Sequence, residues 1–185
     1  NVGEAAIGIK QGPGPILISK NTIHGYRSTT TGQDASGASG ESISVINQAS
    51  GVTISKNHFY DNQKHLVFWV GNNNTDTQPD RNSVVHNNIF GELASPSATE
   101  GDIPVAVAMG RVRNIKVYNN TFSSQYGDEI YLLRMGSANS VELYNNAFYN
   151  GRIHIGEESR VDLLANNNTW AQVTTKNSPY TVYSD

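Results

Sequence analysis

Apolar and polar residues alternate in six short stretches of the chain, and each stretch ends in Asn, a variable residue and a large apolar residue. The clearest is NIKVYNNTF, and the others are ILISKNTI, GVTISKNHF, SVVHNNIF, SVELYNNAF and VDLLANNNTW. Superposition brings Asn21, Asn57, Asn88, Asn120, Asn146 and Asn168 to one position, at successive spacings of 36, 31, 32, 26 and 22 residues. Self-similarity of this kind indicates a solenoid whose repeats carry loops of different length.

A second alternating stretch precedes each of these: AIGIK, SISVI, LVFWVG, VAVAMG, IYLLRMG and RIHIG. Each repeat therefore reads as strand, turn, strand, Asn corner and short third strand. Asn tolerates the left-handed backbone of a sharp bend, and stacked Asn amides can bond one another. We predict an all-β, right-handed parallel β-helix of about six coils with an Asn ladder. A β-sandwich also gives regular turn signals, but it gives no reason for Asn to recur at one phase.

We expect a single domain over residues 1–185, with coils over about 3–170. The tail 171–185 loses the pattern and is expected to cover the terminal coil, because an exposed solenoid end invites strand pairing. Long polar loops interrupt the early coils, among them GNNNTDTQPDR and GELASPSATEGDIP. Loops of this length on one side of a rigid scaffold often carry binding sites.

Strand alternation sorts the side chains of the first strand of each coil by face. The predicted inner columns are Phe68, Val107, Leu133 and Ile153, and Val70, Met109, Met135 and Ile155. The predicted outer columns are Ser44, Trp69, Ala108, Arg134 and His154, and Val67, Ala106, Leu132 and Arg152. An aromatic plane beside guanidinium and imidazole groups suits an acidic sugar chain, because Trp stacks on sugar rings and Arg pairs with carboxylates. The alternative is a solvated sheet with incidental Arg and Trp.

Composition narrows the class of protein. The chain has 185 residues, of which 37% are hydrophobic and 16% charged, as is usual for one soluble domain. The formal net charge of −3 gives no basic surface for nucleic acid, and we expect no membrane span. Cysteine is absent, so a disulfide scaffold is excluded.

The order of phrases carries a family resemblance over residues 3–151. It rests on GIKQGPGPILISKNTI, GESISVINQASGVTISKNHFYDNQKHLVFWVG, SVVHNNIF, GRVRNIKVYNNTF and YGDEIYLLRMGSANSVELYNNAFYNG, of which DNQK and LLRMGSANSVELYNNAF are the most particular. This succession resembles the pectate lyases of the first polysaccharide-lyase family. A weaker resemblance to alginate and chondroitin lyases of the same fold rests on LLRMG. The resemblance implies a secreted monomer that binds an acidic polysaccharide such as pectate or cleaves it by β-elimination.

β-Elimination requires neutralisation of the uronate carboxylate, a base and expulsion of the leaving oxygen. In the resembled family calcium held by acidic residues does the first and an arginine the second. By position, Lys64 in DNQK matches a substrate-binding lysine and Arg111 an arginine of the arginine-rich phrase. The catalytic arginine position holds Ala106 or, with a shifted loop, Asp102. A calcium-binding aspartate position holds Ser44, and the coil that supplies further acids is missing.

The predicted catalytic residues are Arg134, Arg111 and Lys64, and the predicted substrate-binding residues are Trp69, His65, Arg113, Arg152 and His154. The candidate calcium ligands are Asp102, Asp128 and Glu129, although no contiguous calcium-loop motif is present. Two other functions stay open: a catalytically inactive carbohydrate-binding module, and a structural or adhesin-type β-helix segment. A hydrolase ranks lower, because it needs paired carboxylates that the predicted groove face does not show.

Overall fold

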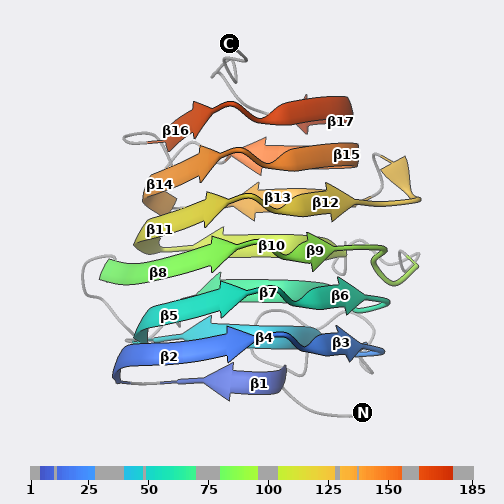
Figure 1. The fold of residues 1–185 in the computed structure, drawn as a ribbon. Helices are drawn as coiled ribbons and strands as arrows, with labels where there is room; N and C mark the ends of the chain where they lie inside the picture. The colour runs from blue at the N-terminus through green and yellow to red at the C-terminus, as the bar shows by residue number, and fades with distance from the viewer. Residues whose placement is uncertain are drawn as a thin grey trace.

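The computed structural model describes residues 5–10, 12–27, 40–47, 49–69, 80–95, 104–127, 130–136, 138–155 and 163–176. All the elements in these residues are β-strands, and they wind in stacked coils around one axis (Figure 1). Every strand pairing is parallel. The prediction of a parallel β-helix is therefore confirmed. None of the described elements is an apolar helix of membrane-spanning length.

The helix has three sides. The first side holds β1 (Ala5–Ile9), β4 (Glu41–Ile46), β7 (Lys64–Trp69), β10 (Val105–Gly110) and β13 (Tyr131–Met135). The second side holds β2 (Pro13–Ser19), β5 (Ser50–Ser55), β8 (Asp80–His86), β11 (Val112–Tyr118), β14 (Ala138–Tyr144) and β16 (Leu163–Asn166). The third side holds β3 (Thr22–His24), β6 (His58–Tyr60), β9 (Ile89–Phe90) and β12 (Thr121–Ser123).

Two long strands join the third side to the first. Strand β15 (Ala147–Ile155) pairs with β12 through its first residues and with β13 through its last ones, so both sides belong to one hydrogen-bonded sheet. Strand β17 (Thr169–Lys176) pairs with β15 from Ala147↔Thr169 to His154↔Lys176. The helix therefore extends past residue 170, where the tail was predicted to begin. Residues 177–185 of that tail lie outside the described residues.

The Asn ladder forms as predicted. From Asn21 to Asn146, each Nδ2 donates to the Oδ1 of the ladder residue in the next coil, at 3.0–3.1 Å. The same Oδ1 also accepts a bond from the preceding ladder residue's backbone N–H, and the central members are buried. One detail differs from the expectation. The left-handed corner residue is the one before each ladder Asn, with φ between 53° and 59°, so the ladder residue itself is free to point inward.

The predicted inner columns are buried. Phe68, Val107, Met109, Leu133, Met135, Ile153 and Ile155 are each no more than 3% exposed, and Val70 lies outside the described residues. Beside them Phe59, Phe90, Phe122, Phe148 and Trp170 form a continuous stack with ring centroids 4.5–5.1 Å apart. Stacked coils thus bury an apolar inner face from one end to the other, as parallel sheets require.

The register of the third coil differs from the prediction by two residues. Phe68 lies opposite Met109, and Leu66 rather than Phe68 lies opposite Val107. The prediction aligned the glycines that end each strand, but Trp69 pairs with Gly110 instead. A Cβ on Gly110 would lie 2.1 Å from the Trp69 ring, so this glycine makes room for the indole. A shift of two keeps Phe68 on the inner face and Trp69 on the outer face, as predicted.

Candidate ligand-binding face

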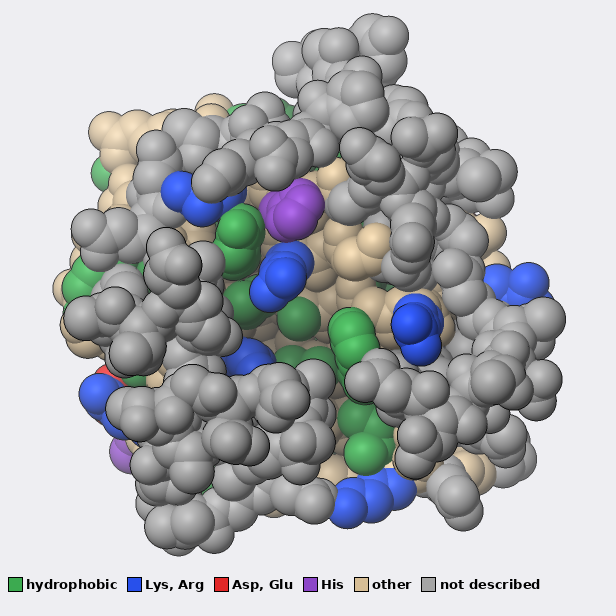
Figure 2. Space-filling view, turned by 180° about the vertical axis from the view of Figure 1, so that it is seen from behind, with side chains coloured by type: hydrophobic (Ala, Val, Ile, Leu, Met, Phe, Trp, Pro, Cys, Tyr) green, Lys and Arg blue, Asp and Glu red, His purple; other side chains and the backbone are tan. Residues whose placement is uncertain are grey.

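The outward surface of β1, β4, β7, β10, β13 and the end of β15 is here named the first outer face. Its central row consists of Gly8, Ser44, Val67, Ala108, Arg134 and His154, which are aligned strand by strand. Five strand steps give this row a length of about 24 Å. Figure 2 shows the face as a hollowed surface on which Lys, Arg and His side chains lie among hydrophobic ones. The face is therefore long enough for several sugar residues.

A cluster of cationic and aromatic groups lies on β13 and β15, and it is named the Tyr131 cluster after its central residue. Arg134 and Arg152 place their guanidinium carbons 5.7 and 5.3 Å from the Tyr131 ring centroid. The His154 ring lies 5.8 Å from the same ring, at a tilt of 35°. Tyr131 is only 8% exposed, whereas Arg134 is exposed and Arg152 and His154 are half-buried. The cluster therefore presents guanidinium groups around an aromatic support, which suits carboxylate recognition.

Three of the predicted site residues, Arg134, Arg152 and His154, meet in this cluster, but Tyr131 was not predicted. Simple alternation from Leu133 gives Tyr131 an inward direction. The register between β13 and β15 shifts between Tyr131 and Leu133, so that Arg152 pairs with Tyr131 and Ile153 with Leu133. The irregularity adds one residue to β13, which alternation alone does not reveal.

Two of the predicted outer residues belong to the hydrophobic core instead. Ala106 and Leu132 are each 0% exposed and belong to the hydrophobic core. Leu132 fits because Gly151 has no side chain, and a Cβ there would lie 2.5 Å from the Leu132 Cγ. The prediction of these residues as an outer column with Arg152 is therefore wrong.

His65 also lies in the interior, at 0% exposure. Its Nδ1 accepts a bond from Asn62 Nδ2 at 3.1 Å, and its Nε2 donates to the Gly91 carbonyl at 3.0 Å. The ring lies between 5.8 and 6.2 Å from the rings of Phe59 and Phe90. Burial lowers the pKa of His65 from 6.5 to about 4, so the ring is neutral. His65 is a structural residue that cannot contact a ligand on the first outer face. Its prediction as a substrate-binding residue is therefore wrong.

The remaining predicted residues are more dispersed. Lys64 and Trp69 are half-buried on β7, two strands from the Tyr131 cluster, and Trp69 lies across Gly110. Arg111 is exposed in the turn after β10, with φ at 52°. Arg113 belongs to β11 on the second side, where it pairs with Asp80 and Asn139, so it does not join the first outer face. The structure thus brings Lys64 and Trp69 to the predicted face but not into the cluster.

Arg81 is a buried cation beneath this region. Its Nη1 donates to the Ala49 carbonyl at 2.6 Å and its Nη2 to the Trp69 carbonyl at 2.9 Å. The side chain is 0% exposed, and its Nε has no hydrogen-bond partner among the described residues. Burial lowers the Arg81 pKa from 12.5 to about 10, so the guanidinium stays charged at neutral pH. It ties the end of β7 to the turn before β5.

A separate hollow of about 360 Å³ lies at the other end of the first outer face, lined by Ala5, Gly8, Lys10, Ser44 and Ile46. One of these residues, Ile46, pairs with Trp69 of the next strand along the face. Among the described residues no three acidic or histidine side chains gather closely enough to hold a metal ion. The candidate calcium ligands Asp102, Asp128 and Glu129 lie outside the described residues. No protein-family model, curated protein or solved structure matches this chain.

Proposed function

We propose that the protein binds an acidic polysaccharide of the pectate type along the first outer face. The observation that carries the proposal is the Tyr131 cluster, in which Arg134 and Arg152 lie over one aromatic ring. The planar fork of arginine matches a uronate carboxylate, and the ring holds both guanidinium groups near one place. Such pairing is stronger than a neutral hydrogen bond, so a few contacts per sugar suffice for recognition.

The rest of the face supports a chain rather than a single sugar. Lys64 lies in the same row as Tyr131 and Arg152, through Val105. Trp69 adds an aromatic plane two strands away, and Lys10 lines the hollow at the far end. Cationic and aromatic groups therefore follow one another along the helix axis, in the way that successive uronates of a polymer would require.

Titration calorimetry with hexagalacturonate tests this proposal. The double change Arg134→Ala and Arg152→Ala is expected to weaken binding by at least roughly a hundredfold, because charge-assisted hydrogen bonds contribute about 1.5–3 kcal/mol each and the change removes two such groups. Arg113→Ala is the control, since it removes one positive charge from the second side. Fully methyl-esterified hexagalacturonate should not bind. Equal binding by the double variant, or indifference to esterification, would overturn the proposal.

Cleavage by β-elimination is a second candidate function. The closeness of the Tyr131 and His154 rings, 5.8 Å apart, favours it, because a phenol and an imidazole beside two guanidinium groups supply proton-transfer groups next to carboxylate binders. Arg111 or Arg134 is the base predicted from the sequence. The test follows the absorbance of the unsaturated product with polygalacturonate, alginate and chondroitin, with and without calcium.

Arg134→Lys separates catalysis from binding. Lys keeps the charge but loses the fork, so in a pure binding protein the change weakens affinity and leaves no rate to lose. If Arg134 is the base, the same change lowers turnover by about 10²–10⁴-fold and affinity much less. Binding without product in every polymer would support the inactive binding module. Absence of both would favour the structural β-helix.

A further inference from the structure

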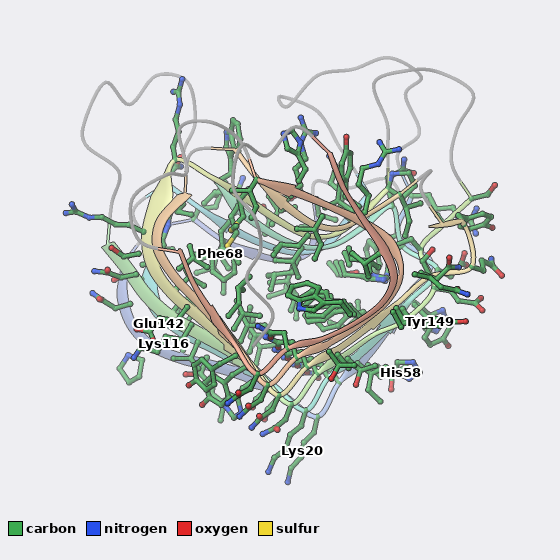
Figure 3. All side chains as sticks on the ribbon, turned by 90° about the horizontal axis from the view of Figure 1, so that it is seen from above. Lys20, His58, Phe68, Lys116, Glu142 and Tyr149 are labelled. Carbon is green, nitrogen blue, oxygen red and sulfur yellow. The ribbon has the colours of Figure 1, made fainter. Side chains whose placement is uncertain are left out.

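The second side of the helix carries a different cleft. The outward surface of β2, β5, β8, β11 and β14 is here named the second outer face. A cleft of about 540 Å³ lies on it, lined by Asn82, Val84, Asn114, Lys116, Ser140 and Glu142. In Figure 3 the labelled Lys116 and Glu142 project outward from the second side, away from Phe68 in the interior. This cleft shares no lining residue with the hollow of the first outer face.

The backbone shapes the cleft. Asn82, Asn114 and Ser140 all have a left-handed conformation, with φ of 44°, 57° and 51°. They lie in three adjacent strands. Asn82 and Asn114 lie where the register between β8 and β11 shifts, and Asn114 and Ser140 directly precede the paired residues Ile115 and Val141 of β11 and β14. A left-handed residue inside a strand bends it, so three aligned ones fold the sheet along a line. The bend makes a concave surface lined by amide and hydroxyl groups.

The cleft has no net charge. Lys116 and Glu142 are its charged lining residues, they lie directly opposite each other on β11 and β14, and Lys116 Nζ is 3.2 Å from Glu142 Oε1. Each therefore neutralises the other. The remaining lining residues are neutral hydrogen-bonding groups and one valine. An acidic ligand has no advantage here, whereas a neutral ligand rich in hydroxyl groups can use both donors and acceptors.

Aromatic rings continue the same strands beyond the ion pair. His86, Tyr118 and Tyr144 lie opposite one another and stack with centroids 5.0 and 4.8 Å apart. Partial burial, with smaller effects from Tyr118 and Glu142, raises the pKa of Tyr144, so its hydroxyl remains a donor. Tyr beside Asn and Ser is the combination that recognition surfaces use for amphipathic contact with adaptable hydrogen bonds.

From this combination of shape, neutrality and lining, we infer that the second outer face binds a neutral glycan. Strands spaced about 4.8 Å apart repeat the same three groups, namely an amide or hydroxyl, a residue of the row Val84, Lys116 and Glu142, and an aromatic ring. A linear chain of neutral sugars lying across β8, β11 and β14 would meet this set once per strand. The inference does not depend on acidic-polysaccharide binding at the first outer face.

The test uses four neutral probes, cellohexaose, xylohexaose, mannohexaose and β-1,4-galactohexaose, titrated into the whole protein by calorimetry. Saturable binding of at least one is expected. Val84→Trp, a β-favouring change, fills the cleft and should weaken that binding by at least roughly tenfold, since the ligand must leave its contacts. Leu17→Trp is the matched control, because Leu17 lies in the same row two strands away and is 67% exposed.

A second variant keeps the test valid if Val84→Trp does not fold. Asn114→Gly removes the amide but suits the left-handed backbone, and should weaken binding by about fivefold, as expected for one or two lost hydrogen bonds. Hexagalacturonate should not displace the neutral probe. The inference is overturned if none of the four probes binds saturably, if both variants bind as the parent does, or if Leu17→Trp is as harmful as Val84→Trp.

Discussion

The two outer faces of this β-helix differ in the charges that the stacking of parallel coils places side by side. On the first outer face the residues opposite Arg134 are Ala108 and His154, and Arg152 pairs with Tyr131, so positive charge accumulates around a ring. On the second outer face Lys116 lies opposite Glu142, so the charges cancel. Parallel coils place like positions side by side, and a single residue per coil therefore decides whether a face becomes cationic or neutral. The difference suggests two ligand classes for one scaffold.

Core truncations behind each face should give the largest effects. Leu133→Ala and Leu143→Ala remove buried side chains from β13 and β14, at 0% and 2% exposure, so each should lower the unfolding free energy by about 2–5 kcal/mol in urea titrations. Leu133→Ala should weaken the binding of hexagalacturonate more than that of the neutral probe. Leu143→Ala should weaken the binding of the neutral probe more. Equal losses at both faces would mean that the faces do not act independently.

The buried His65 makes the folded protein less stable in acid. Ligand binding at the two faces can therefore be compared only above the pH at which this stability is lost. The unfolded chain takes up a proton near pH 6.5, whereas the folded His65 does so only near pH 4. The stability is therefore full above pH 6.5 and falls as the pH drops toward 4, by up to about 3 kcal/mol. Protonation would also direct an Nδ1–H at the Asn62 amide. In chemical denaturation at several pH values, His65→Phe should flatten this slope, and an unchanged slope would contradict the assignment.

Salt should affect ligand binding at the two faces differently, and this effect is expected to be smaller. Raising the ionic strength from about 0.05 to 0.5 M shortens the Debye length severalfold, and should weaken hexagalacturonate binding by about tenfold while changing the neutral probe less than about twofold. Calorimetric titrations of both ligands on one protein sample measure this. The same salt response for both ligands would remove the distinction between a cationic and a neutral face.

The smallest effect is expected for the ion pair itself. Lys116 and Glu142 are 52% and 36% exposed, so a double-mutant cycle with Lys116→Ala and Glu142→Ala should give a coupling energy of only about 0.2–1 kcal/mol. The pair therefore sets the charge of the second outer face rather than its stability. A coupling well above this range would show a structural role instead.

Much of the scaffold was predictable because periodicity records it. Asn57, Asn88 and Asn120 recur at one phase, since the ladder needs an amide at each corner. Met109, Met135 and Ile155 are apolar at equivalent positions of successive coils because the inner face is buried. The third coil was misaligned because a glycine was taken as a strand end. Gly110 instead leaves room for Trp69, a relation between neighbouring coils that a single repeat does not show.

The candidate site was less predictable because it depends on departures from periodicity. Tyr131 reaches the first outer face through an irregular register, and His65 turns inward where its strand begins. Neither event leaves a local signal in the chain. Arg134, Arg152 and His154 were found because they directly flank the inward residues Leu133 and Ile153 in regular alternation. Arg113 does not join this face, since it lies past the corner, on β11.

Arg81 gives the molecule a fixed source of electric field. Its charge lies in the interior, with its guanidinium hydrogen-bonded to the backbone of Ala49 and Trp69 rather than to any described carboxylate. Mobile ions cannot approach it closely, so its field is screened far less than that of surface lysines. Part of the attraction between the Trp69 region and a polyanion should therefore persist in concentrated salt.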